Sequence, residues 1–236
     1  MRRTTTLLGA TLLALTSAPV AAQDASSALP AETGTAMVRV LHASPDAPDV
    51  DIYLDGAAVG DPLAGLAFGE ISSYVPVPAG PHAIKVCATA DATVCPIDVP
   101  ELTVEDGMSY TIAATNVLAS IEPQVLVDTT TADPANALVR VVHFSADAPA
   151  VDVLTQDGAT TVVSALAYPS STDYLALPAG SYDLKVCANA DTTVCPIDPP
   201  ALDLAAGTAY TVFAIGSLEG GSLVPVVAVD VAPPAA

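Results

Sequence analysis

Short apolar runs broken by turn-forming residues predict an all-β protein. After the first 35 residues the chain consists of segments rich in Val, Ile, Thr and Tyr, separated by Pro, Gly and Asp. Val50, Ile52 and Leu54 alternate with polar or aromatic residues, as in a strand with one buried face. Asp55-Gly56 follows as a tight-turn signal. No stretch has a helical period, so the pattern predicts many strands and no long helix.

The same pattern occurs twice along the chain. Val38–Pro48 returns as Val139–Pro149, and Lys85–Asp98 returns as Lys185–Asp198. The period of about 100 residues is too long for a solenoid unit and matches one small domain. We therefore expect two tandem copies, each able to fold on its own. The expected segments are 36–128 for the first copy, 129–136 for a short polar linker and 137–231 for the second copy.

Each copy is expected to be an immunoglobulin-like antiparallel β-sandwich, because several strands spaced by turns fill about 90 residues. Tyr110 and Tyr210 each enter the longest strand of their copy just after a Gly turn. This placement resembles the tyrosine corner, in which the Tyr hydroxyl bonds back to the preceding loop. The alternative is a plain core aromatic at the start of a strand.

The first 22 residues predict a cleaved signal peptide. Arg2-Arg3, a short apolar stretch and small residues follow one another before Gln23. The apolar stretch is shorter than the roughly 20 residues that cross a bilayer. We expect export by the general secretory route, a disordered leader over 23–35, a tail at 232–236 and no membrane insertion after cleavage. The protein would then be secreted, and either extracellular or periplasmic.

The chain is strongly acidic, with 26 acidic and 6 basic residues and a net charge of −20. Because Arg2 and Arg3 lie in the predicted signal peptide, the mature chain keeps four basic residues and a net charge of −22. Nucleic acids and anionic lipids bind through phosphates that Lys and Arg neutralise, so this charge argues against both as partners. The dispersed Asp residues fit a solubilising surface; adaptation to salt and weak binding of divalent cations are the alternatives.

Four cysteines form one closely spaced pair in each copy. Cys87 and Cys95 have seven residues between them, as do Cys187 and Cys195. In an exported chain they are expected to be oxidised. Three pairings are possible, and the duplication favours one local disulfide in each copy. A zinc site is the alternative, although its ligands usually come as closer Cys-x-x-Cys pairs.

The repeated motif resembles a known family. Arg39 to Gly56 and Arg140 to Gly158 both contain Arg-Val-x-His-x-Ser-x-Asp-Ala-Pro, and a Pro-Ala-Gly turn follows later in each copy. This pattern is similar to the bacterial and archaeal DUF4397 domain. The resemblance implies an exported β-sandwich, commonly in tandem, at the surface or outside the cell. It implies no activity. The second copy departs from the first at Ala146 and Ala150, which replace Pro45 and Asp49.

The spacing of His, Ser and Asp, which is the same in both copies of this motif, suggests a catalytic-triad hypothesis. The residues concerned are His42, Ser44 and Asp46 in the first copy and His143, Ser145 and Asp147 in the second. Alternate side chains of a strand lie about 6–7 Å apart, beyond the contact of roughly 3 Å that a nucleophile and its base need. We therefore favour a structural role, in which Ser and Asp bond nearby amides to hold a Pro-rich turn and His completes the network. No catalytic residue is assigned, and we expect a protein that is not an enzyme.

Acidic residues near the motif are weak candidates for calcium ligands, because Ca²⁺ takes 6–8 oxygen ligands. The first copy offers Asp46, Asp49, Asp51 and Asp55, whose spacing is not that of an EF-hand. The second copy keeps only Asp147, Asp152 and Asp157. Sugar binding would need an exposed aromatic ring; the chain has no Trp and offers Tyr53, Tyr74 and Tyr174.

These observations predict an exported, non-enzymatic interaction or spacer module without a cofactor, acting at the cell surface or outside the cell. The alternative is a polysaccharide- or calcium-binding protein that uses the Asp-rich end loops. The partner is not identified by the sequence; an envelope component or a polysaccharide is the candidate.

Overall fold

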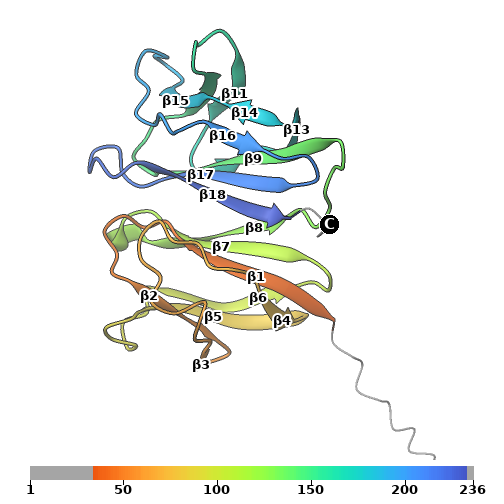
Figure 1. The fold of residues 1–236 in the computed structure, drawn as a ribbon. Coiled ribbons are helices and arrows are strands. Elements are labelled where there is room, and N and C mark those ends of the chain that lie inside the picture. The colour runs from red at the N-terminus through yellow and green to blue at the C-terminus, as the bar shows by residue number, and fades with distance from the viewer. Residues whose placement is uncertain (1–33, 233–236) are drawn as a thin grey trace, which may run out of the picture. The chain divides into compact units, whose positions relative to one another are not determined.

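Strands make up almost all the regular structure in residues 34–232, the part of the chain that the computed structural model describes (Figure 1). The predicted signal peptide lies outside these residues, as do most of the leader and most of the tail. The one helical segment described is a short 3-10 turn, η1, at Leu118–Ser120. No helix in residues 34–232 is long and apolar enough to cross a membrane. The all-β prediction is confirmed.

The first repeat contains eight strands, which pair into two four-stranded sheets. One sheet has the order β4-β1-β7-β8 and the other β3-β2-β5-β6. Asp55 and Gly56 both have positive φ, at 51° and 82°, so the predicted tight turn connects β2 to β3. The bounds are β1 Thr35–His42, β2 Val50–Leu54, β3 Ala57–Ala58, β4 Val75–Pro78, β5 Gly80–Ala88, β6 Ile97–Val104, β7 Ser109–Thr115 and β8 Glu122–Asp128.

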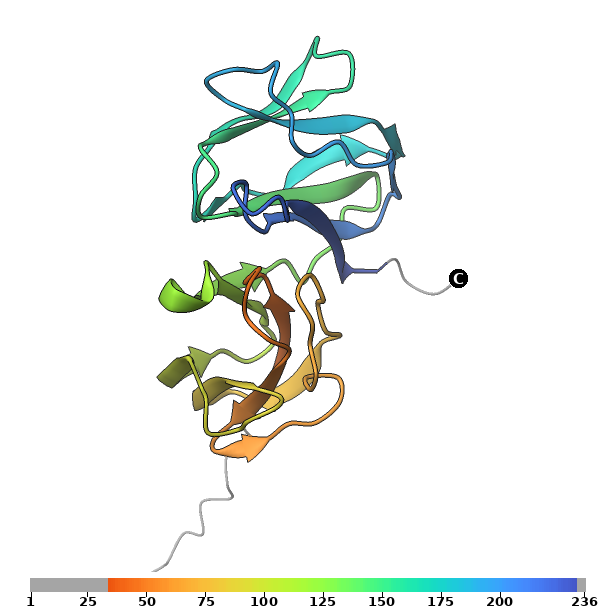
Figure 2. The same cartoon turned by 90° about the vertical axis from the view of Figure 1, so that its left-hand side faces the viewer.

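The second repeat follows the same course with a more broken second sheet. Its first sheet, β12-β9-β17-β18 with β13 also paired to β9, corresponds to that of the first repeat. The remaining strands form two separate groups, β11-β10-β15 and β14-β16. Figure 2 gives a second view of these strands. The bounds are β9 Asn136–Phe144, β10 Val151–Thr155, β11 Thr161–Leu166, β12 Ser170–Ser171, β13 Leu175–Pro178, β14 Gly180–Tyr182, β15 Leu184–Ala188, β16 Leu202–Leu204, β17 Ala209–Ile215 and β18 Val224–Val231.

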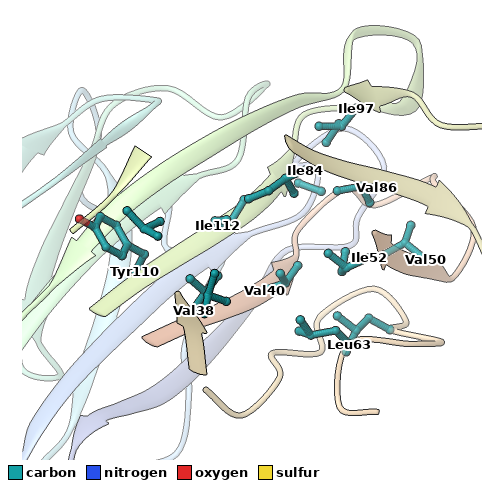
Figure 3. Packing of buried hydrophobic residues seen from close by; sticks show 14 of the residues in the cluster. Val38, Val40, Val50, Ile52, Leu63, Ile84, Val86, Ile97, Tyr110 and Ile112 are labelled. Carbon is teal, nitrogen blue, oxygen red and sulfur yellow. The ribbon is translucent and has the colours of Figure 1, made fainter. Parts of the chain in front are cut away.

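Each repeat is a β-sandwich, as predicted. In the first repeat, inward-facing residues of the two sheets meet in one core, with Val40 and Ile112 on one side and Ile52, Ile84 and Val86 on the other (Figure 3). These five side chains are at most 4% exposed. They occupy alternate positions on their strands, which is the period that the sequence shows.

The strand order differs from the constant-type immunoglobulin arrangement, in which the first, second, fourth and fifth strands share a sheet. Here β1 shares its sheet with β4, β7 and β8, and it runs parallel to β7. β9 runs parallel to β17 in the second repeat. The immunoglobulin-like part of the prediction is therefore not confirmed.

The central strands β1, β7, β9 and β17 are buried on both faces. One face covers the core of the strand's own repeat. The other face packs against the other repeat, where Leu41 and Ala113 join Val142, Phe144 and Phe213 in one apolar cluster. Strands that are buried on both faces are apolar almost throughout, as these are. The two repeats therefore share an extensive apolar interface between their first sheets.

The disulfide and tyrosine predictions are both confirmed. Cys87 is bonded to Cys95, and Cys187 to Cys195, so the local pairing holds and the zinc alternative falls. The Tyr110 hydroxyl accepts a hydrogen bond of 3.1 Å from the Glu105 amide, and Tyr210 does the same at 3.2 Å from Ala205. These bonds back to the preceding loop are the geometry of a tyrosine corner.

Strand limits near the repeat boundaries differ slightly from the expected ones. β1 begins at Thr35, one residue inside the predicted leader, and β9 begins at Asn136, the last residue of the predicted linker. In both cases the added residue pairs with the Pro that ends a facing strand, Pro78 or Pro178. Pairing with a distant strand sets these limits, and a local pattern does not contain that information.

Candidate functional site

The His of each repeated motif ends a central strand and organises the turn that follows. We call residues 42–48 and 143–149 the signature turns. His42 is fully buried; its Nε2–H donates to the Pro48 carbonyl at 3.0 Å, and its Nδ1 accepts from the Ser44 amide at 3.4 Å. His143 makes the same two contacts, with Pro149 at 3.1 Å and Ser145 at 3.3 Å. Because the amide occupies Nδ1, the proton of each neutral ring resides on Nε2.

Burial lowers the pKa of His42 and of His143, although the carbonyl contacts with Pro48 and Pro149 oppose this shift. Both rings are therefore neutral at pH 7. With both nitrogens occupied by backbone groups, neither ring has a free nitrogen to accept a proton from a nucleophile.

The serine hydroxyls of the signature turns do not bond to the histidines. Ser44 meets His42 through its backbone amide, and its buried hydroxyl has no hydrogen-bond partner among the described residues. The Ser145 hydroxyl donates to Asp147 at 3.2 Å. A triad needs the hydroxyl against the imidazole, so the arrangement matches the structural role that we favoured and not a nucleophile with its base.

The Asp of each signature turn binds the loop between the last two strands of its repeat. Asp46 accepts a hydrogen bond of 2.6 Å from the Leu118 amide. Asp147 accepts from the amides of Leu218 and Glu219 at 2.8 and 2.9 Å and from the Ser217 hydroxyl at 2.6 Å. Burial opposes ionisation of Asp147, yet these hydrogen bonds hold its pKa at about 2.

The two signature turns line one cleft of about 280 Å³. Equivalent residues of the two repeats meet there in pairs, and Tyr168 contributes from the second repeat. The pairs are Pro45 with Ala146, Asn116 with Gly216, and Val117 with Ser217. The duplicated motif therefore builds a single feature of the surface.

The candidate calcium ligands of the first repeat do not converge on one point, because Asp51 and Asp55 form hydrogen bonds with different parts of the repeat. Asp51 accepts from the Gly65 amide and the Thr89 hydroxyl at 2.7 and 2.8 Å. Asp55 contacts His82 at 2.8 Å and the Ala83 amide at 2.9 Å. Asp46 and Asp49 are exposed residues. Residues 34–232 contain no group of three or more His, Cys, Asp or Glu side chains arranged to hold a metal ion.

The aromatic candidates for sugar binding are covered by arginines. The Arg39 guanidinium lies 4.5 Å from the centre of the Tyr74 ring, and that of Arg140 lies 4.8 Å from the Tyr174 ring. Burial raises the pKa of both tyrosines, that of Tyr174 to about 12. Both rings are half-buried, and each has an arginine on its face. Tyr53 is half-buried on β2.

Sequence reasoning missed a buried ionic network centred on these two arginines. Arg39 donates from Nε to the Thr111 hydroxyl at 2.8 Å and then crosses to the second repeat, where it bonds the Val229 carbonyl at 3.1 Å and the Asp230 carboxylate. Its side chain is 3% exposed and that of Asp230 is 0% exposed.

Arg140 makes the equivalent contacts in the opposite direction. It donates from Nε to the Thr211 hydroxyl at 3.1 Å, and it reaches the Val127 carbonyl at 2.9 Å and the Asp128 carboxylate of the first repeat. Tyr74 and Tyr174 donate to Asp128 and Asp230 at 2.7 and 2.8 Å. A signal was available in the sequence: after the first 22 residues, two of the four basic residues lie at matching positions within apolar strands.

Comparison with known proteins finds the same domain family in each of the two repeats. The family described as "Domain of unknown function (DUF4397)" matches residues 36–154 and again residues 137–236. No curated protein matches the chain. Among solved structures, the chain is similar to the C-terminal domain of AlgF from P. aeruginosa, at 27% identity over 40% of this chain and 98% of that one, with a TM-score of 0.33. The two family matches span both sandwiches, and the chain therefore belongs to the DUF4397 family, as two tandem copies of its domain.

Proposed function

We propose that this chain is an exported, non-enzymatic interaction module whose two repeats act as one rigid body and present the cleft between the signature turns to a partner at the cell surface or outside the cell. The single observation that carries the proposal is the reciprocal burial of Arg39 against Asp230 and of Arg140 against Asp128. Each of these charges loses its partner if the repeats separate, so the two turns are held together.

The chemistry of the signature turns supports a role without catalysis. Their histidines and aspartates form hydrogen bonds with backbone groups and so hold the turns in place. The bonds of His42 to Pro48 and of Asp46 to Leu118 are examples. What remains accessible in the cleft is a set of small polar and apolar side chains, including Asn116 and Val117. Such a surface suits recognition of another macromolecule better than bond making.

The two disulfides support export, because such bonds persist in oxidising compartments. The acidic composition would keep the module soluble and away from nucleic acid. We take an envelope component of the producing cell as the partner. Calcium binding is the alternative. In that case Asp46 and Asp49 would bind Ca²⁺ together with oxygen ligands supplied by the partner.

A sedimentation assay tests the proposal. The purified protein is mixed with envelopes from the producing cells and centrifuged, with calcium or with a chelator, at low and at high salt. Val117→Arg places a long charged side chain in the cleft, at a position that is 39% exposed. Val94→Arg makes the same change in the disulfide loop, at a position that is 52% exposed and outside the cleft.

We expect the native chain and Val94→Arg to sediment with the envelopes and Val117→Arg to remain in the supernatant, with unchanged melting temperatures. Equal loss for both variants would mean that charge alone governs binding. No sedimentation of the native chain in any condition would refute an envelope partner. Sedimentation that needs calcium would favour the alternative.

A further inference from the structure

The second sandwich encloses a far larger cavity than the first. A space of about 270 Å³ lies between its sheets, whereas the corresponding core space of the first repeat is about 70 Å³. Val139, Val141, Val153 and Val212 line the larger cavity, and their counterparts Val38, Val40, Ile52 and Ile112 line the smaller one. Protein interiors seldom leave voids larger than a water molecule, so this difference between two copies of one domain calls for a cause.

The break in the second sheet is that cause. In the first repeat β5 and β6 pair on both sides of a register shift between His82 and Ile84, and Ile84 itself pairs with Val99. The residue equivalent to Val99 is Pro199, which has no amide hydrogen to donate to the neighbouring strand. Pairing there is reduced to an isolated bridge at Val186 and the short β14–β16 ladder. The segment around Pro199 leaves the sheet, and the core beneath it opens.

The residues that line the two cores also differ in size. Some of these differences enlarge the cavity of the second repeat, and others reduce it. Val153 and Val212 each have one carbon fewer than their counterparts Ile52 and Ile112. Leu175, Leu177 and Leu204 are each one carbon larger than theirs, so the cavity is not simply a sum of small residues. Ile112 is 2% exposed, whereas Val212, at the centre of β17, is only partly buried.

The cavity offers no free polar side chain. Of the two polar residues in its wall, Tyr182 donates its hydroxyl to the Pro178 carbonyl at 2.8 Å, and both nitrogens of His143 are already bonded. A water molecule needs two to four polar partners, so water gains little here. Two exposed residues in the wall, Pro200 and Val227, mark where the cavity reaches the surface.

We propose that this cavity is a binding site for a small neutral molecule with a hydrocarbon body, such as a one- or two-ring hydrocarbon or a short alkyl chain. An apolar cavity of about 150 Å³ is large enough for benzene, so 270 Å³ accommodates a larger molecule. Asp198 and Asp203 flank the opening in the sequence, and the chain carries a net charge of −20, which disfavours an anionic headgroup. The site is distinct from the cleft and does not depend on the proposed function.

Titration of the full chain with naphthalene tests the site, with 1-octanol as an acyclic probe. Methyl NMR spectra report which Val and Leu residues respond. Val153→Ile with Val212→Ile, called the filled variant, reduces the cavity by two methylene groups and introduces the residues that the first repeat carries at the same positions. Val229→Ile makes the same chemical change on β18, where the side chain is 47% exposed and does not line the cavity.

We expect one equivalent of naphthalene to bind with a dissociation constant below about 1 mM, which corresponds to −4.1 kcal/mol. Methyl shifts should be confined to the second repeat. The filled variant should bind at least tenfold more weakly and Val229→Ile as the native chain does. Failure of both probes to bind, methyl shifts in the first repeat, or full affinity in the filled variant would each overturn the proposal. The NMR map locates the site in the native chain even if the filled variant folds poorly.

Discussion

Arg39 in the first repeat and Asp230 in the second form an ion pair whose side chains are 3% and 0% exposed. Arg140 and Asp128 form the same pair in the opposite direction, at 5% and 0%. Reciprocity of this kind defines an isologous contact, in which one patch is complementary to a copy of itself. The duplication has therefore placed within one chain an interface of the type that two identical domains form with each other.

Arg39→Met should destabilise the protein strongly. The substitution keeps most of the apolar stem but leaves Asp230 buried with only the Tyr174 and Thr211 hydroxyls as donors. Removal of one partner from a buried ion pair typically costs about 3–5 kcal/mol. Urea unfolding followed by circular dichroism measures the free energy. Lys85→Met is the control: its pair with Asp98 is 43% and 51% exposed and should be worth about 0–1 kcal/mol. Similar small losses for both variants would contradict the role given to Arg39.

Local patterns predicted the sandwich, the turns and the disulfides, because each depends on residues close together in the sequence. The alternation at Val50 and Ile52, the Asp55-Gly56 turn and the placement of Tyr110 are of this kind. The parallel pairing of β1 with β7 joins residues more than 70 positions apart, as Met37 and Ser109 illustrate. No local signal encodes that choice, which is why the immunoglobulin-like arrangement was not confirmed.

The inter-repeat interface escaped prediction for a related reason. Leu41 and Phe213 lie on the outward faces of central strands, and an apolar residue in a strand does not reveal which of two cores it enters. Arg39 belongs to the repeated motif, and the motif alone does not show that its guanidinium crosses to the other repeat. The polar stretch at 129–136 suggested a spacer between independent domains, whereas Thr129 itself donates from its amide to the Tyr174 hydroxyl of the second repeat at 3.2 Å.

Asp147→Asn should cost more stability than Asp46→Asn, although the two residues are equivalent in the repeat. Asp147 accepts four hydrogen bonds, from Ser145, Ser217, Leu218 and Glu219, whereas Asp46 accepts one. Because hydrogen bonds to a charged group are the stronger ones, we expect a loss of about 1–2 kcal/mol for the Asp147 variant and less for the other.

The pH dependence gives a second test of Asp147. Its pKa of about 2 lies below the ordinary value of 3.8, so its contribution is present above pH 4 and is lost as the pH falls through 2. The difference in unfolding free energy between native chain and Asp147→Asn should therefore shrink between pH 4 and pH 2. A difference that does not change with pH would mean that the charge of Asp147 plays no part.

The buried histidines should make the protein less stable in mild acid. Burial lowers the pKa of His42 and His143 in the folded state below the ordinary 6.5, so the unfolded chain takes up protons first. Above pH 6.5 the two histidines are mostly neutral in both states and cost no stability. Below pH 6.5 proton uptake by the unfolded chain lowers the free energy of unfolding. His82 acts in the opposite sense, because the hydrogen bond that it donates to the Asp55 carboxylate raises its pKa, and its contribution fades as the pH rises.

Unfolding in urea between pH 5 and pH 7.5 separates these effects. His82→Gln removes the opposing group, so stability in this variant should fall more steeply with acid than in the native chain. In His42→Gln the acid-dependent part should be smaller, whatever the loss at neutral pH. A stability that stays constant from pH 7.5 to pH 5 in His82→Gln would be incompatible with buried neutral rings.

Each disulfide closes a short loop, with a sequence separation of 8 in both repeats. On the loop-entropy account, removing one should cost about 2–3 kcal/mol. Replacing Cys87 and Cys95 together by Ala, and Cys187 and Cys195 likewise, measures the two values by urea unfolding. Mass mapping without reduction checks the pairing. Free thiols in the protein from its native compartment would undermine both the pairing and the export hypothesis.

The first repeat alone, residues 34–131, should form a homodimer. Its interface face carries Arg39 and Asp128, so a second copy can supply the carboxylate that Asp230 supplies in the intact chain. As a monomer it would expose Leu41 and Ala113, both 0% exposed in the full protein, and leave Arg39 unpaired. Sedimentation equilibrium gives the mass. Leu41→Arg should abolish the dimer, whereas Val94→Arg, in the exposed disulfide loop, should not. A stable, folded monomer at all concentrations would mean that the interface depends on differences between the repeats and not on their shared surface.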